Sequence, residues 1–223
     1  FGGPKDVISS SNVEVYVGEF PIRIDANGND VLCLIDSSQY PCLSINSPIH
    51  FYSLEPISHE VIYSPIAMVI TSVSPYIMKT SFTLASLLLF YQPFTISGIS
   101  TDIILNCLSD DHECFFIYTY ESLGAGIQFR FRDITFQNIT NGILFSKNAN
   151  ILFDGCIFQY NIQKTLINGL DSNIDINHCI IMNNYINSST SSLVTVSRSR
   201  LTFVNVSIYN NTIIHQVAEI DGQ

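Results

Sequence analysis

Charged residues are scarce in this sequence. Asp, Glu, Lys and Arg make up only 13% of the 223 residues, whereas apolar residues make up 47%. Such a chain is too hydrophobic to be disordered, and it has too little Lys and Glu for an ordinary helical protein. Basic residues are scarcest in residues 1–126, which hold 13 acidic and 3 basic side chains, whereas residues 127–223 hold 6 of each. The acidic half argues against nucleic acid and anionic membrane surfaces as partners.

Several signatures of chemistry are also missing. The sequence contains no Cys-x-x-Cys pair, which disfavours a zinc site, and it offers no Gly-rich phosphate loop or Ser/His/Asp arrangement. It opens at Phe1 with neither an initiator Met nor a secretory signal, so we expect a processed or truncated chain. Two uncharged stretches, Val61–Met78 and Ser81–Thr101, are interrupted by turn-forming residues. We predict strands and turns there, and no transmembrane segment in this chain.

The second half of the chain contains an internal repeat. Four segments share the pattern apolar-x-apolar-x-x-apolar-x-apolar and end in an Asn-rich turn; they begin at Ile127, Asn150, Asn173 and Arg200. Equivalent apolar positions form columns with offsets of 22, 23 and 27 residues, such as Ile134, Cys156, Cys179 and Val206. A period of this length, with short strands and no helical stretch, predicts a β-solenoid whose coils stack about 4.8 Å apart.

We therefore predict an all-β fold, a right-handed parallel β-helix (solenoid) with coils of about 22–27 residues. The coils are expected in residues 94–223, and residues 1–93 are expected to supply strands and an irregular N-terminal cap. Within this cap, Ser44–Ser53 is the best candidate for a helix. A bare coil end exposes unpaired strand edges, so we expect either that the coils continue beyond the end of this chain or that another copy covers this end.

The same alignment predicts contacts between neighbouring coils. Three asparagines follow the fourth apolar column and are expected to form a hydrogen-bonded ladder along the axis: Asn161, Asn184 and Asn211. Two outward ion pairs are expected between adjacent coils: Arg132 with Asp154, and Arg198 with Asp171. Each pair adds little stability, but both support this register.

Cysteines and glycosylation sequons together favour an oxidising, extracellular environment. Cys33 with Cys42 and Cys107 with Cys114 are disulfide candidates because each pair is close in sequence. Cys156 and Cys179 share a column in adjacent coils, which fits either a disulfide or two free thiols. The candidate glycosylation sites, each in an N-x-[S/T] triplet, are Asn138, Asn187, Asn205 and Asn210.

Two further groups of residues are candidates for binding. The densest polar cluster lies at residues 110–113, where Asp110, Asp111 and Glu113 are candidate ligands of a divalent cation; the alternative is an exposed acidic loop. Exposed aromatic residues are candidates for stacking on sugars or partner surfaces, the alternative being ordinary packing at corners. They are Tyr118, Tyr120, Tyr160, Tyr185 and Tyr209.

Particular motifs carry a resemblance to a known group of proteins. They are the run Tyr40-Pro-Cys-Leu-Ser-Ile after Cys33, the segment Phe94-TISGISTDIILNC, the strand Phe115-FIY and the segment Phe129-RFRDITFQNITNG. In this order they resemble the long pectin-lyase-like β-helix proteins on the surfaces of unicellular eukaryotes, which are similar in turn to bacterial polymorphic outer-membrane-protein repeats. The bacterial Gly-Gly-Ala-Ile element is absent here. The resemblance implies an extracellular location and an adhesive or structural role, with no catalytic residues and no cofactor.

Our functional expectation is an extracellular structural or adhesive glycoprotein, a subunit of a surface layer or filament, and not an enzyme. Its expected partners are other copies of itself, other surface proteins or glycans. A carbohydrate-binding module is the first alternative. A polysaccharide lyase or hydrolase is the second, because related folds host such enzymes. For that chemistry, which needs two facing carboxylates, the only acids to nominate are Asp154 and Asp175.

Overall fold

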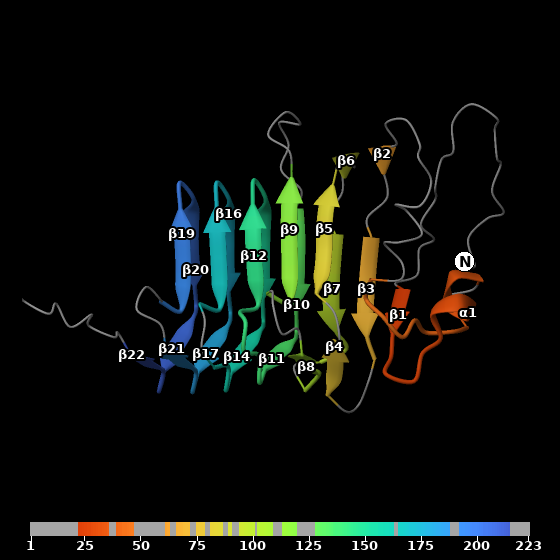
Figure 1. The fold of residues 1–223 in the computed structure, drawn as a ribbon, viewed down its shortest axis with the longest axis horizontal. Helices are drawn as coiled ribbons and strands as arrows, with labels where there is room; N and C mark the ends of the chain where they lie inside the picture. The colour runs from red at the N-terminus through yellow and green to blue at the C-terminus, as the bar shows by residue number, and fades with distance from the viewer. Residues whose placement is uncertain are drawn as a thin grey trace, which may run out of the picture.

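The computed structural model describes the repeat region almost completely and the N-terminal region in pieces. The described residues are 22–35, 39–46, 61–62, 66–71, 75–78, 81–86, 89–90, 94–100, 102–108, 113–119, 128–162, 165–187 and 192–214. Apart from one helix, α1 (Asp30–Ile35), their regular elements are strands that pair in parallel. The predicted parallel β-solenoid is confirmed (Figure 1).

The central coils contribute one strand to each of three sheets, which have seven, six and five strands. The first sheet contains β1 (Ile22–Ile24), β3 (Ile66–Ile70), β7 (Phe94–Gly98), β10 (Gln128–Arg132), β13 (Asn150–Asp154), β16 (Asn173–Asn177) and β20 (Arg200–Val204). The second contains β4 (Tyr76–Met78), β8 (Ile104–Cys107), β11 (Thr135–Gln137), β14 (Ile157–Gln159), β17 (Ile180–Met182) and β21 (Ser207–Tyr209). The third contains β5 (Phe82–Ser86), β9 (Phe115–Thr119), β12 (Leu144–Lys147), β15 (Ile167–Leu170) and β19 (Val194–Ser197). Two smaller pairs join β18 (Tyr185–Asn187) to β22 (Thr212–Ile214) and β2 (Val61–Ile62) to β6 (Leu89–Phe90).

The core consists of inward side chains that stack from coil to coil. Alternation along each strand sends every second residue inward, and the parallel register places like residues above one another. Phe131 stacks on Phe153 with ring centroids 4.8 Å apart, and Phe136 stacks on Phe158 at 5.3 Å. In the last described coil, inward residues such as Phe203 are exposed, because no further described coil covers them.

The corners of the coils are built from residues with left-handed backbone. At the first corner, between the first and second sheets, they are Asp133, Gly155, His178 and Asn205. At the second corner, which follows the second sheet, they are Asn138, Tyr160, Asn183 and Asn210. At the third corner, between the third and first sheets, they are Asn148, Asp171 and Arg198. Asn, Asp and Gly adopt this conformation most readily, which accounts for the Asn-rich turns of the repeat.

The residue after each of these left-handed positions points inward, and where it is polar it links adjacent coils. At the second corner, Asn161 N–H donates to Asn184 Oδ1 at 3.1 Å, and Asn184 N–H donates to Asn211 Oδ1 at 3.0 Å. The predicted asparagine ladder is therefore confirmed. A serine ladder that the sequence did not reveal occupies the third corner, where Ser172 Oγ accepts from Ala149 N–H and Ser199 Oγ accepts from Ser172 N–H. The ladders satisfy corner N–H groups that the sheets leave unpaired.

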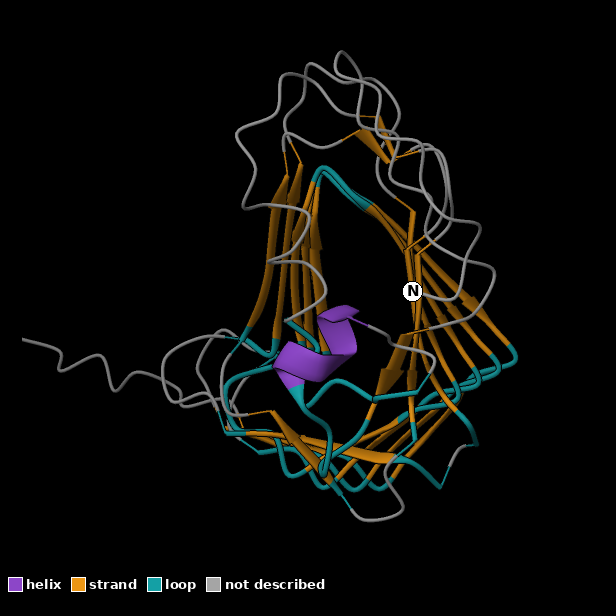
Figure 2. Ribbon diagram, turned by 90° about the vertical axis from the view of Figure 1, so that its right-hand side faces the viewer, coloured by secondary structure: helices purple, strands orange, loops and turns teal. Residues whose placement is uncertain are grey.

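The cap at the N-terminal end of the stack is built around α1, which lies across that end in Figure 2. Asn29 Oδ1 accepts hydrogen bonds from the N–H groups of Val31 and Leu32 and so caps the helix. Asp30 Oδ1 accepts two more from Leu43 and Ser44, both at 2.9 Å. These bonds tie the helix to the chain segment 39–46.

Two expectations for this region differ from the structure. The helix is not where we predicted it: of Ser44–Ser53, residues 44–46 are described and form no helix, and residues 47–53 lie outside the described part. The stack also begins before residue 94, because β3, β4 and β5 already lie in the three sheets. No helix among the described residues is long and apolar enough to span a membrane.

Candidate functional site

The outer surface of the solenoid holds the candidate glycosylation sites. All four asparagines, Asn138, Asn187, Asn205 and Asn210, are exposed. In three of the four sequons the hydroxyl residue is also described and exposed, at Thr140, Ser207 and Thr212. For Asn187 the hydroxyl residue, Ser189, lies outside the described part. Each described sequon therefore presents both of its essential side chains to solvent.

The first sheet carries ionisable side chains on its outer face, and they pair across coils. Asp154 lies 3.6 Å from Arg132 on one side and 3.1 Å from His178 on the other. Asp175 lies 3.5 Å from Arg200 of the next coil. The Arg132–Asp154 pair was predicted from the register, whereas the His178 and Arg200 contacts were not. Each of these carboxylates thus faces a cationic or titratable partner.

A second predicted ion pair closes the third corner. Arg198 donates two hydrogen bonds to the carboxylate of Asp171, at 2.7 and 2.6 Å. These bonds hold the pKa of the Asp171 carboxyl below its ordinary value. Both residues have left-handed backbone, with φ of 51°. The pair therefore gives Arg198, which is unfavourable in this conformation, a specific contact.

The second corner displays an uncharged strip along the axis. One row of paired residues along the axis consists of Gln137, Gln159, Met182 and Tyr209. The left-handed residues of the corner come next in each coil, and two positions after them lies a second row, which consists of Thr140, Ile162, Tyr185 and Thr212. The Gln137 and Gln159 amides bond to each other at 3.0 Å. Tyr160, Ile162 and Tyr185 are 49%, 45% and 39% exposed. Ile162 pairs with Tyr185 and lies two residues after Tyr160, so these three exposed apolar residues are neighbours at the corner and are called the corner patch below.

Tyr160 is the unusual member of this strip. Its φ is 55°, and the equivalent residues in the other three repeat coils, which contain β11, β17 and β21, are all asparagine. A left-handed backbone costs a bulky residue about 1–2 kcal/mol. His178 and Arg198 adopt the same conformation, but each makes a cross-coil contact with an aspartate. Within the described part of the chain, the Tyr160 side chain makes no such contact.

The other candidate aromatic residues differ from one another. The Tyr118 ring is half-buried and lies 5.2 Å from the ammonium group of Lys147, a cation–π contact. The Tyr209 hydroxyl lies 2.8 Å from the sulfur of Met182. Tyr120 lies outside the described residues. Of the predicted aromatic residues, Tyr160 and Tyr185 are therefore the described ones that remain candidates for contact with a ligand.

The six cysteines fall into two classes. Cys33–Cys42 and Cys107–Cys114 are disulfides, as predicted, and they indicate an oxidising environment. Cys156 and Cys179 are free, buried thiols that belong to the ladder of the first corner. Cys156 N–H donates to the Cys179 sulfur at 3.3 Å, and burial raises the pKa of the Cys156 thiol. Of the two arrangements that the sequence left open, the structure has the free thiols.

The predicted metal site lies mostly outside the described part, because Asp110 and Asp111 are not described. Glu113 is half-buried beside Gly142. Among the described residues, no group of three or more His, Cys, Asp or Glu side chains is arranged to hold a metal ion. The cation site remains a prediction.

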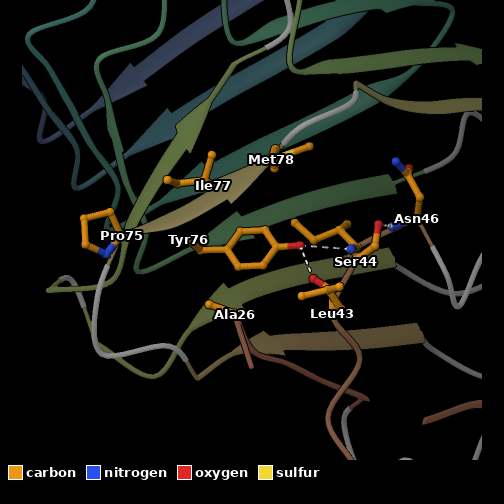
Figure 3. A pocket seen from close by; sticks show the side chains of 9 residues that line it. Ala26, Leu43, Ser44, Asn46, Pro75, Tyr76, Ile77 and Met78 are labelled. Atoms are coloured by element: carbon orange, nitrogen blue, oxygen red, sulfur yellow. Dashed lines mark hydrogen bonds between the residues drawn. The ribbon is translucent and has the colours of Figure 1, made fainter. Parts of the chain in front are cut away.

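A pocket of about 380 Å³ lies between the cap and β4 (Figure 3). Its main polar side chain is Tyr76, whose hydroxyl donates to Leu43 O at 2.8 Å and accepts from Ile45 N–H at 3.2 Å. Burial raises the pKa of Tyr76 to about 12. The hydroxyl is occupied by backbone partners, so Tyr76 fastens the cap to the first coils.

Comparison with known proteins finds no match to this chain among protein-family models, curated proteins or solved structures. Functional assignment therefore depends on the geometry of the solenoid itself.

Proposed function

We propose that this chain is an extracellular structural or adhesive glycoprotein, whose solenoid is a rigid scaffold for surface contacts. The observation that carries the proposal is the set of four exposed sequon asparagines, three of them at corners, on a disulfide-containing solenoid. Disulfides and glycosylation sequons occur together in secreted proteins. The resemblance of the repeats to pectin-lyase-like surface proteins of unicellular eukaryotes supports the same assignment.

The outer charges support a structural role over a catalytic one. Hydrolysis of a glycosidic bond needs two carboxyl groups that flank the bond. Asp154 and Asp175 instead face Arg132 and Arg200 across coils, at 3.6 and 3.5 Å. Such exposed pairs add little stability, but they favour one register of the stack. A scaffold with neighbouring copies or other surface proteins as partners fits this arrangement.

The first test is glycopeptide mapping of the protein purified from the cells that make it, with quantification of free thiols. We expect glycan on at least one of Asn138, Asn187, Asn205 and Asn210, and oxidised Cys107 and Cys114. Unmodified asparagines together with reduced cysteines would overturn an extracellular location.

The second test is cryo-electron microscopy of the native material, which distinguishes forms of the scaffold. Filaments or layers are the result expected of a structural subunit. Separate particles at high concentration would remove the filament version and leave an adhesin. Loss of cell attachment after addition of the purified protein as a competitor would then be the expected result.

A further inference from the structure

The corner patch lies directly beside a candidate glycosylation site. The pairing of Gln137 with Gln159 places the next residues, Asn138 and Tyr160, side by side in adjacent coils. Both have φ of 55°, so the backbone directs the two Cα–Cβ bonds away from the corner in the same way. Adjacent coils are about 4.8 Å apart. A sugar attached to the Asn138 amide would therefore begin within reach of the Tyr160 ring.

The patch continues away from Asn138 along the axis. Ile162 follows Tyr160 at the same corner, and Tyr185 pairs with Ile162 in the next coil. All three side chains are exposed. The described residues of the surrounding strip are uncharged, and the register places Gln159 just before Tyr160 and Asn183 opposite it in the next coil. Apolar rings flanked by neutral amides suit a neutral sugar, whose C–H faces pack on rings while its hydroxyls bond to amides.

We propose that Asn138 carries an N-linked glycan and that the corner patch is the platform on which its first sugars pack. This inference rests on the proposed role as an extracellular glycoprotein, and it names the site and the ligand. The glycan covers the corner patch and links the coil that begins at β10 to the two coils after it.

The backbone of Tyr160 is an independent observation for this site. A strained conformation without local compensation is characteristic of a residue retained for a ligand. Asn fills the equivalent position in the neighbouring coils and adopts the conformation more easily, so the ring at Tyr160 has a use that asparagine does not supply. His178 and Arg198 have their aspartate partners, whereas the partner of Tyr160 is the Asn138 glycan.

A double-mutant cycle in a glycosylating eukaryotic host tests the contact. Thr140→Ala removes the sequon without changing Asn138, and Tyr160→Asn removes the ring. Without the glycan, Tyr160→Asn is expected to raise the melting temperature, because the left-handed strain is relieved. With the glycan, the loss of sugar contacts offsets that gain. The change in melting temperature caused by Tyr160→Asn should therefore differ by about 2 °C or more between the glycosylated protein and the Thr140→Ala background.

The matched control is Thr212→Ala, which removes the sequon of Asn210. The neighbour of Asn210 in the preceding coil is Asn183, not an aromatic residue. No coupling between Thr212→Ala and Tyr160→Asn is expected.

Nuclear magnetic resonance supplies a second readout that a purely structural role of Tyr160 would not change. The acetyl methyl group of the first N-acetylglucosamine on Asn138 is expected to shift upfield in the ring current of Tyr160. Tyr160→Asn should return it to the position seen in a free glycopeptide. A glycan on Asn138 without coupling and without this shift overturns the inference and leaves the glycoprotein role intact.

Glycopeptide mapping separates the remaining outcomes. A bare Asn138 with glycan on Asn187, Asn205 or Asn210 overturns this inference alone. Four bare asparagines overturn both the inference and the glycoprotein role.

Discussion

Replacing Asn184 with alanine tests whether the asparagine ladder stabilises the solenoid. Asn184 is 1% exposed and makes four side-chain hydrogen bonds. Its Oδ1 accepts from the backbone and side-chain N–H groups of Asn161, at 3.1 and 2.9 Å. Its Nδ2 donates to Phe158 O and to Asn211 Oδ1, both at 2.9 Å. One residue thus joins three successive coils.

The expected loss follows from the groups left without partners. Asn184→Ala removes the acceptor of the buried Asn161 N–H and a donor to the Phe158 carbonyl. An unsatisfied buried polar group costs about 1–3 kcal/mol, so two of them lower the free energy of unfolding by about 3 kcal/mol. In a chain of this size that loss corresponds to a fall in melting temperature of roughly 6–12 °C.

Urea denaturation followed by circular dichroism measures this change. The matched control is Asn173→Ala, because Asn173 points outward and its amide makes one exposed bond, to Asn150 at 2.8 Å. We expect that control to stay within about 0.5 kcal/mol of the parent. If Asn184→Ala and Asn173→Ala give the same stability, buried ladder bonds do not stabilise the stack and the reasoning fails.

Three further predictions concern the cap and the first corner. Because burial raises the pKa of Tyr76 to about 12, the neutral hydroxyl is favoured in the folded state. The contribution of Tyr76 to the free energy of unfolding is therefore fully present below pH 10 and is lost, by about 3 kcal/mol, as the pH rises to 12. Urea titrations at several pH values measure this loss, and Tyr76→Phe should abolish it. Replacing Cys33 and Cys42 with serine opens a loop with a sequence separation of 9 and should lower the free energy of unfolding by about 2–3 kcal/mol; an unchanged urea midpoint would contradict this. Gly155→Ala should lower the melting temperature, because φ there is 66° and an added Cβ would lie 2.7 Å from Asp133 Oδ1; calorimetry with Gly169→Ala, where φ is not positive, separates backbone strain from crowding.

The repeat region was predictable because one rule determines every coil. The alignment offsets of 22, 23 and 27 residues reappear in three successive pairings: Phe129 with Ile151, Ile151 with Ile174, and Ile174 with Leu201. Inward columns must be apolar or bond to themselves, so a column of asparagines indicates a ladder. The register and the second-corner ladder can therefore be predicted from the sequence alone, without information on tertiary contacts.

The cap was not predictable in the same way. α1 has only six residues, too few to form without tertiary contacts. Its position depends on the bonds of Asp30 to Leu43 and Ser44 and on the Cys33–Cys42 disulfide. The serine ladder was missed for another reason. Ser172 and Ser199 each lie one residue before an aligned repeat segment, so the four-column pattern does not include them.

The corners show how one coil plan combines a conserved interior with a variable surface. Each of these corners has a left-handed residue followed by an inward residue, which is either apolar or accepts a hydrogen bond from the preceding coil. A polar inward residue is constrained, because its polar atom is buried and has defined partners. The left-handed residue is constrained only in its backbone, and its side chain faces solvent. A bulky residue there loses stability unless it gains a partner outside its own coil. His178 and Arg198 gain aspartates, whereas no such partner is found for Tyr160 among the described residues, and for this reason we propose the Asn138 glycan as its partner.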